Sequence, residues 1–177
     1  MLSIIGYLVS IITFPGVIVH EAAHQLFCRI NKVAVLKVCY FQFQNPFGYL
    51  IHEKPDKAYK NVLIGIGPFF VNTIIGAIIA LPGAIPVIEF ETGNLLEYFL
   101  IWLGVSIAMH SFPSIGDAKN IWKSVWNKET GILLKIIATP IVGLIYLGAV
   151  GSILWLDLIY GIAVAMFVPN LLVMIFA

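Results

Sequence analysis

Charged side chains are scarce in this chain and are missing from most of its length. Lysine and arginine number 10 and aspartate and glutamate 9 of 177 residues, a charged share of 11%, against about 25% in soluble globular domains. Hydrophobic residues make up 60% of the chain. This composition excludes an ordinary soluble fold and predicts an integral membrane protein, with residues 1–177 forming a single membrane-embedded domain.

Basic residues are absent from two connections between apolar segments, and this absence predicts the orientation in the membrane. All ten fall within residues 29–60 and 119–135, which we expect in the cytoplasm because cytoplasmic loops carry the excess of Lys and Arg. Residues 81–98 hold three glutamates and no basic residue, and the last connection holds only Asp157. We expect both connections and the N-terminus outside, in a multi-pass protein of the cell membrane.

Other scarcities exclude further classes of protein. Only two cysteines are present, Cys28 and Cys39, too few for a disulfide framework, and thiols near the cytoplasm stay reduced. A net charge of +1 gives no reason to expect nucleic acid as a partner. The first apolar segment has no basic residues before it, so we expect a retained span rather than a cleaved signal peptide.

Long apolar tracts predict an all-α polytopic fold with about five transmembrane helices. These tracts are residues 2–30, 62–82, 95–112 and 132–176. The last is long enough for two spans with a turn near residues 151–157. Pro15-Gly16 predicts a kink or break within the first tract.

The connection after the first span has the pattern of a small β-hairpin. Residues 33–43 are rich in Val, Tyr and Phe, a turn signal follows at residues 44–48, and residues 49–53 can return as a second strand. Open strand edges cannot face lipid, so such a hairpin must lie in the interface or against the helices, lining a cavity. A plain cytoplasmic loop is the alternative.

A second connection, residues 117–128, interleaves two tryptophans and two aliphatic residues with three lysines. This pattern predicts an amphipathic helix on the membrane surface. We expect its tryptophans to act as interfacial anchors.

Against this apolar background, His20-Glu21-Ala22-Ala23-His24 stands inside the first span. Residues four apart share one face of a helix, so His20 and His24 can bind one metal ion while Glu21 lies beside them as a base. Ionisable groups at membrane depth are costly unless they are paired or coordinated. The motif therefore predicts one zinc ion per chain, with a polar helix-packing cluster as the alternative.

A catalytic zinc ion usually takes three protein ligands, so the third must come from elsewhere. Asp117 follows the third span on the cytoplasmic side, after Pro113 and Gly116, which would break the helix and let the carboxylate turn inward. The alternative is that Asp117 only caps the next helix. His110 is a weaker candidate that we leave out of the predicted ligand set.

The motif on the first span, Gly-Pro-Phe-Phe-Val-Asn at residues 67–72 and the Pro-containing Asp element together resemble the site-2 protease family of intramembrane zinc metalloproteases. The resemblance covers residues 17–120, a catalytic core to which residues 131–177 add two spans. It implies that His20, His24 and Asp117 bind zinc, that Glu21 is the base and that Asn72 helps to hold the substrate backbone. It also implies hydrolysis of a peptide bond in or near a transmembrane segment of a membrane protein or membrane-anchored peptide.

Two other hypotheses stay open on the sequence. The chain could be a non-catalytic zinc-binding membrane protein that acts as a sensor or a partner-binding module. It could also be a prenyl-protein endopeptidase-like enzyme, which uses the same histidine motif with a glutamate as the third ligand. Cleavage of a transmembrane peptide would distinguish a protease from the non-catalytic protein. Loss of zinc from an Asp117→Ala variant would distinguish it from the prenyl-protein endopeptidase-like enzyme, which predicts no loss.

Overall fold

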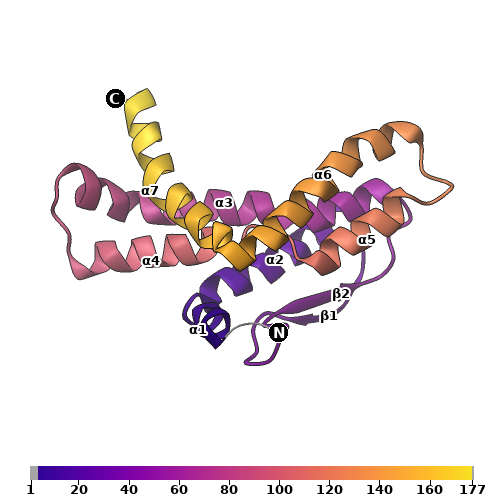
Figure 1. Cartoon of the computed structure of the whole chain (residues 1–177), viewed down its shortest axis with the longest axis horizontal. Helices are drawn as coiled ribbons and strands as arrows, with labels where there is room; N and C mark the ends of the chain where they lie inside the picture. The colour runs from indigo at the N-terminus through magenta and orange to yellow at the C-terminus, as the bar shows by residue number, and fades with distance from the viewer. Residues whose placement is uncertain (1–3, 177) are drawn as a thin grey trace.

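The computed structural model describes residues 4–176, except for the side chains of residues 153, 170, 172, 173 and 176, and is mostly helical (Figure 1). The elements in chain order are α1 (Ile4–Ile12), α2 (Phe14–Ile30), β1 (Val35–Cys39), β2 (Tyr49–His52), α3 (Ala58–Glu89), α4 (Leu95–Met109), α5 (Ile115–Val125), α6 (Ile132–Gly151), the short 3-10 turn η1 (Ser152–Leu154) and α7 (Leu156–Phe176).

Helix α3 is the axis of the molecule. It has 32 residues, and α4 returns beside it while α7 packs on both (Figure 1). Helix α2 packs against the first half of α3 and the C-terminal end of α4, and α5 and α6 pair with each other beside the first half of α3. The motif helix therefore lies between α3 and α4 on one side and the hairpin on the other.

Two helices, α3 and α6, are long and apolar enough to cross a membrane. Helices α1 and α2 meet at an angle of 74° and add a third candidate if the pair is one span. This bend confirms the break predicted near Pro15-Gly16, although it falls at Thr13, and Pro15 lies in the first turn of α2. Helix α4 and the stretch Leu156–Pro169 are apolar but shorter, so the number of five spans stays a prediction.

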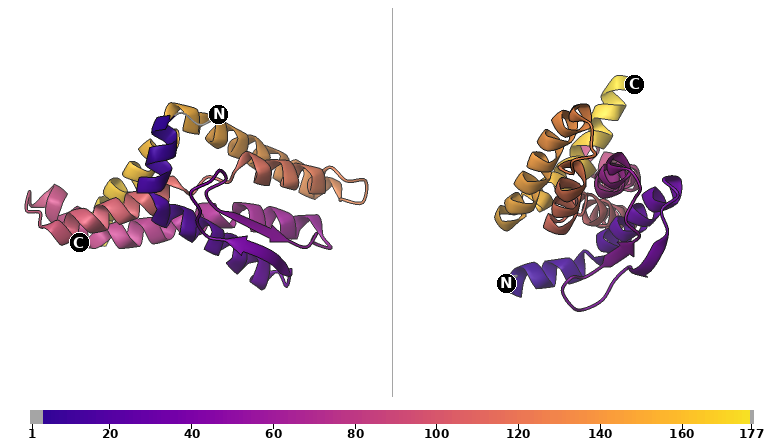
Figure 2. Two further views of the ribbon diagram at one scale, coloured as in Figure 1. Left: turned by 90° about the horizontal axis from the view of Figure 1, so that it is seen from below. Right: turned by 90° about the vertical axis from the view of Figure 1, so that its right-hand side faces the viewer.

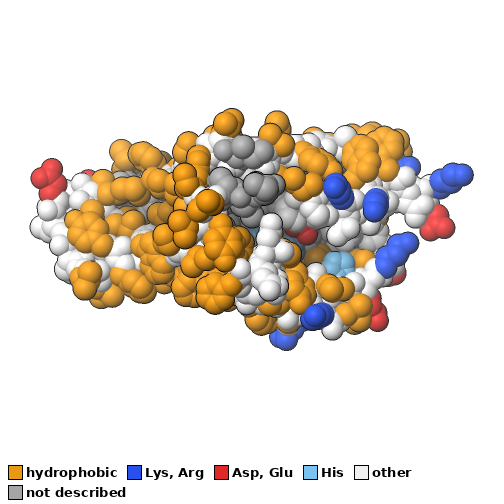
Figure 3. Space-filling model, turned by 60° about the horizontal axis from the view of Figure 1, so that its bottom comes forward, with side chains coloured by type: hydrophobic (Ala, Val, Ile, Leu, Met, Phe, Trp, Pro, Cys, Tyr) orange, Lys and Arg blue, Asp and Glu red, His pale blue; other side chains and the backbone are white. Residues whose placement is uncertain are grey.

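The charged side chains are segregated along the long axis. Figure 3 shows Lys and Arg gathered at the end that holds the start of α3 and the α5–α6 loop, while acidic side chains without basic ones mark the opposite end. Hydrophobic side chains cover the surface between them. This distribution is the one expected of a protein whose basic end faces the cytoplasm.

The turn between α6 and α7 differs from the sequence-based expectation. Helices α6 and α7 do meet near residues 151–157 as predicted, but the turn lies near the middle of the molecule rather than at the end with the α3–α4 connection (Figure 1). Asp157 lines a cavity together with His20 and Glu21, so our expectation that it lies with the outer glutamates is wrong. Hydropathy gives the length of an apolar helix but not its tilt, which depends on its packing partners.

The predicted hairpin is confirmed. Strands β1 and β2 pair antiparallel, with Cys39 opposite Tyr49 and Val35 opposite His52. The strands are shorter than the predicted segments, and the hairpin lies along α2 (Figure 2). A position against the helices is one of the two that we expect for a hairpin with open strand edges.

Helix α5 confirms the helix predicted over residues 117–128, with a different environment. Ile121 and Val125 are buried against α6 and the start of α3, whereas Trp122 and Trp126 are 42% and 52% exposed. The aliphatic residues of this helix thus pack inside the protein, while its tryptophans lie on the surface. Its aliphatic half holds α5 against α6 and the start of α3.

Candidate metal centre

The local sequence of α2 lets the motif approach α4 closely. A β-carbon on Gly16 would collide with the backbone carbonyl of Ser106 in α4, so only glycine allows this contact. One turn further along α2, His20 lies under the segment that leaves α4. The close approach therefore sets where the first imidazole meets the rest of the site.

The Nδ1 atoms of both motif histidines are bonded to backbone carbonyls. His20 Nδ1 lies 2.7 Å from the carbonyl oxygen of His110, and His24 Nδ1 lies 2.9 Å from that of Ile64. A carbonyl oxygen can only accept, so each Nδ1 carries a proton, and in the neutral imidazole each Nε2 then offers a lone pair. This arrangement is typical of metal-binding histidines, whose second nitrogen is oriented by such a bond.

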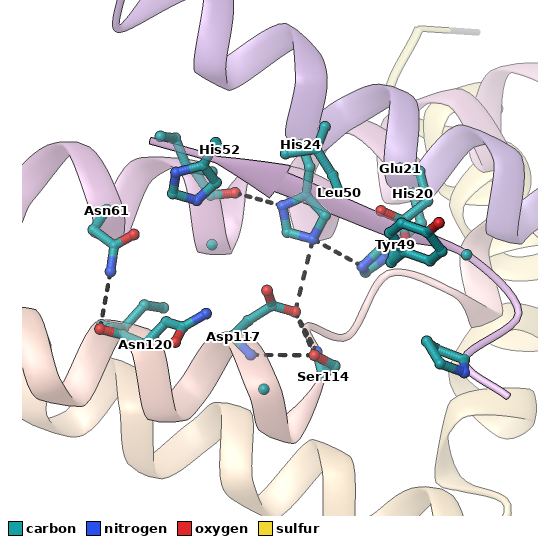
Figure 4. A pocket seen from close by; sticks show the side chains of 16 residues that line it. His20, Glu21, His24, Tyr49, Leu50, His52, Asn61, Ser114, Asp117 and Asn120 are labelled. Carbon is teal, nitrogen blue, oxygen red and sulfur yellow. Dashed lines mark hydrogen bonds and ion pairs between the residues drawn. The ribbon is translucent and has the colours of Figure 1, made fainter. Parts of the chain in front are cut away.

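The two Nε2 atoms face each other at 3.1 Å, as Figure 4 shows. With both Nδ1 atoms protonated, neither neutral Nε2 has a hydrogen to share, and the two lone pairs repel. A cation between them removes this repulsion. The donor set thus fits a metal ion better than it fits a pair of uncharged imidazoles.

Asp117 supplies the third candidate ligand. Its Oδ2 lies 3.7 Å from His24 Nε2, and one ligand atom from each of the three residues lies within 4.8 Å of the others. Bonds of about 2.0–2.2 Å to a tetrahedral zinc ion place ligand atoms about 3.3–3.6 Å apart. The structure therefore brings together the three residues predicted as ligands, from α2 and α5.

The alternative role of Asp117 is also present. Ser114 is the N-cap of α5, and its backbone N–H and hydroxyl both donate to Asp117 Oδ2, at 2.8 and 2.7 Å. Burial opposes ionisation of this carboxyl group, but the nearby His24 and His20 side chains and the hydrogen bond from Ser114 outweigh it and hold the pKa of Asp117 below its ordinary value. One carboxylate thus caps α5 and faces the imidazoles.

Glu21 lies beside the cluster and lines a cavity of about 360 Å³ with it. The side chain is 7% exposed. A β-carbon on Gly48, in the loop of residues 40–48 that we call the hairpin tip, would come within 3.1 Å of Glu21 Oε1, so this loop closes tightly over the carboxylate. Strand β2 forms one wall of the same cavity through Tyr49, Leu50 and His52.

Asn72 is placed differently from the other predicted site residues. It is fully buried, and its Nδ2 lies 3.1–3.2 Å from the carbonyl oxygens of Gly16, Ile107 and His110. The His110 carbonyl is also the partner of His20. Asn72 therefore supports the orientation of the first imidazole, and a direct contact with substrate stays a prediction.

This support predicts the behaviour of an Asn72→Ala variant. Loss of the amide removes one hydrogen bond from each of three buried carbonyl groups and loosens the partner of His20, so we expect lower thermal stability and a zinc affinity reduced about 10- to 100-fold. Asn61→Ala is the matched control, because the Asn61 amide joins α3 to α5 away from His20. Competition with a zinc-binding dye measures the affinities, and equal losses in both variants would contradict the assigned role.

Two residues of the site were missed by the sequence reasoning. His52 lines the metal cavity, and nothing in the sequence of a short strand shows on which side its histidine lies. His110 contributes its backbone carbonyl to His20 and Asn72 rather than its ring to the metal. A carbonyl leaves no signature in a sequence, so no pattern could have assigned this role.

No protein-family model, no curated protein and no solved structure matches this chain. What the structure defines is a mostly helical chain with apolar helices long enough to cross a membrane and a possible His20–His24–Asp117 metal site.

Proposed function

We propose that this chain is an intramembrane zinc metalloprotease, similar to the site-2 protease family, with one zinc ion held by His20, His24 and Asp117. The observation that carries the proposal is the pair of Nε2 atoms that face each other at 3.1 Å, each free to bind a metal ion because a backbone carbonyl holds the Nδ1 atom of the same ring. A carboxylate faces this pair. Two imidazoles and one carboxylate form a ligand set known for catalytic zinc, which keeps a fourth position for water.

The chemistry assigns Glu21 the role of general base. When bound, zinc lowers the pKa of a water ligand to about 7 and polarises the scissile carbonyl. Glu21 accepts the proton of the attacking water and returns it to the leaving amine. The low exposure of Glu21 and the hairpin tip above it keep bulk water away from this transfer.

The hairpin provides a place for the substrate backbone. A transmembrane helix hides its carbonyl groups in its own hydrogen bonds, so a short segment must unwind before hydrolysis. Among the described residues β2 pairs with β1 alone, and β2 lines the metal cavity. An unwound segment that adds to β2 as a strand would present its carbonyl groups near the cluster.

We propose a multi-pass topology in the cell membrane, with the N-terminus outside and both basic loops in the cytoplasm. The gathering of Lys and Arg at one end of the molecule (Figure 3) supports this orientation. The substrate is then a membrane protein or membrane-anchored peptide that reaches the site within the bilayer.

Metal removal tests the proposed function. The purified protein in liposomes should contain one zinc ion per chain and cleave a transmembrane peptide; a chelator should stop cleavage and added zinc should restore it. Metal analysis and mass spectrometry of the products provide the measurements. Bound zinc without cleavage of any transmembrane peptide would favour the non-catalytic alternative, a zinc sensor or partner-binding module.

A further inference from the structure

A second cavity, of about 340 Å³, shares His20 and Glu21 with the metal cavity. Its other walls come from α1, the hairpin tip, the segment after α4 and the α6–α7 turn. Apolar side chains form much of it, including Val17, Phe47 and Phe112. The two cavities thus meet at the proposed base, and a segment lying along β2 would continue from the first into the second.

The serine side chains of this cavity have already donated their hydrogens. Ser10 and Ser152 donate to backbone carbonyls of their own segments, at 2.9 and 2.8 Å, and Ser114 donates to Asp117 at 2.7 Å. Each hydroxyl oxygen can therefore only accept a further hydrogen bond, and the Ser114 oxygen already accepts one from the Asp117 backbone N–H at 3.2 Å. No lysine or arginine lines the cavity among the described residues.

His110 and Asp157 also offer hydrogen-bond acceptors to this cavity. His110 Nδ1 lies 2.9 Å from the carbonyl oxygen of Ser106, so it carries the proton and Nε2 is an acceptor. Asp157 accepts one bond, from the backbone N–H of Leu158 at 2.9 Å, and makes no ion pair with a basic residue in the described structure. The cavity is thus apolar along its walls and lined by acceptors alone at its polar positions.

We propose that this cavity binds the cationic side chain of a substrate residue adjacent to the scissile bond, with Asp157 as the counter-ion. The inference rests on the proposed function. A lysine or arginine buries its methylene stem against apolar walls and needs acceptors for its charged end. Transmembrane segments carry such residues at their cytoplasmic ends, the side on which we place the site.

A binding experiment tests the site without relying on catalysis. Met109 lines the cavity, so a 13C-labelled methionine methyl group reports its occupancy by NMR, with the signal assigned by Met109→Leu. The probes are n-butylammonium, which reproduces the end of a lysine side chain, and 1-butanol as its neutral counterpart. We expect n-butylammonium to shift the Met109 signal with an affinity at least about tenfold higher than that of 1-butanol.

Variants test whether Asp157 causes the preference for n-butylammonium over 1-butanol. Asp157→Asn should make the affinities for n-butylammonium and 1-butanol equal, and Asp157→Glu should restore the preference for the cation. The pair of variants distinguishes the effect of the negative charge from an effect of misfolding. Glu129→Gln, which removes a carboxylate lining a different cavity, should change nothing. Equal binding of both probes by the wild type would overturn the proposal. Loss of the preference in Glu21→Gln instead of Asp157→Asn would also overturn it, because the cation would then be held by the base.

Cleavage provides the second measurement. Two transmembrane peptides that differ only in lysine or norleucine beside the scissile bond should show a ratio of kcat/KM of at least about ten in favour of lysine. Asp157→Asn should lower this ratio toward one. If the wild type cleaves neither peptide, the proposed function fails, while the methyl titration still decides whether the cavity binds a cation.

Discussion

A Glu21→Gln variant should keep its zinc and lose cleavage of a transmembrane peptide. Glutamine has the same size and shape as glutamate but cannot accept the proton of the attacking water at neutral pH. General bases contribute about 10²- to 10⁴-fold to rates, so we expect a loss of this size in the single-turnover rate. The zinc content should not change, because Glu21 is outside the ligand group of His20, His24 and Asp117.

The matched control is Glu53→Gln, the same chemical change at an exposed residue just after β2. It should leave both zinc and cleavage as they are in the wild type. Undiminished cleavage by Glu21→Gln would refute the mechanism. Joint loss of zinc and cleavage would instead show that Glu21 helps to hold the metal, and elemental analysis of the same sample distinguishes these outcomes.

An Asp117→Ala variant should show a larger decrease in zinc affinity than a variant that loses only a supporting hydrogen bond. Removing the carboxylate leaves only the two imidazoles, whereas outer hydrogen bonds cost about 10- to 100-fold in metal affinity. We therefore expect a decrease beyond 100-fold, measured by competition with a chelator of known affinity. Retention of zinc by Asp117→Ala would favour an enzyme whose third ligand is a glutamate.

Asp117 also belongs to the capping box of α5, so the alanine variant changes two interactions. Asp117→Asn separates them, because an amide oxygen can still accept from Ser114 but is a poorer zinc ligand. We expect this variant to keep most of its thermal stability and to lose zinc. Ser114→Ala, which weakens the cap and leaves the carboxylate in place, should cost about 1 kcal/mol in stability and bind zinc more tightly than Asp117→Asn does.

The parts of the site that sequence could predict are those set by short-range geometry. His20 and His24 lie one helical turn apart, so any helix through the motif places both imidazoles on one face. The hairpin was marked by a turn signal between two β-rich segments. Asp117 was found by elimination, from the side of the membrane and the residues that break the preceding helix, and the structure places it with the histidines.

The remaining parts depend on contacts between distant segments. The carbonyl groups of Ile64 and His110 orient the histidines, and backbone atoms carry no residue code. Asp157 reaches the neighbourhood of Glu21 because α6 and α7 meet in the middle of the molecule, an arrangement that depends on how α7 packs on α3 and α4. Apolar composition gave the lengths of these helices and not their crossing points.

The sharing of one carboxylate oxygen between Ser114 and His24 has a thermodynamic consequence. Any influence that unwinds the first turn of α5 withdraws a ligand, and any ion that occupies the cluster strengthens that turn by the same coupling free energy. Metal affinity and the stability of the first turn of α5 are thus thermodynamically linked, so a change in one must appear in the other.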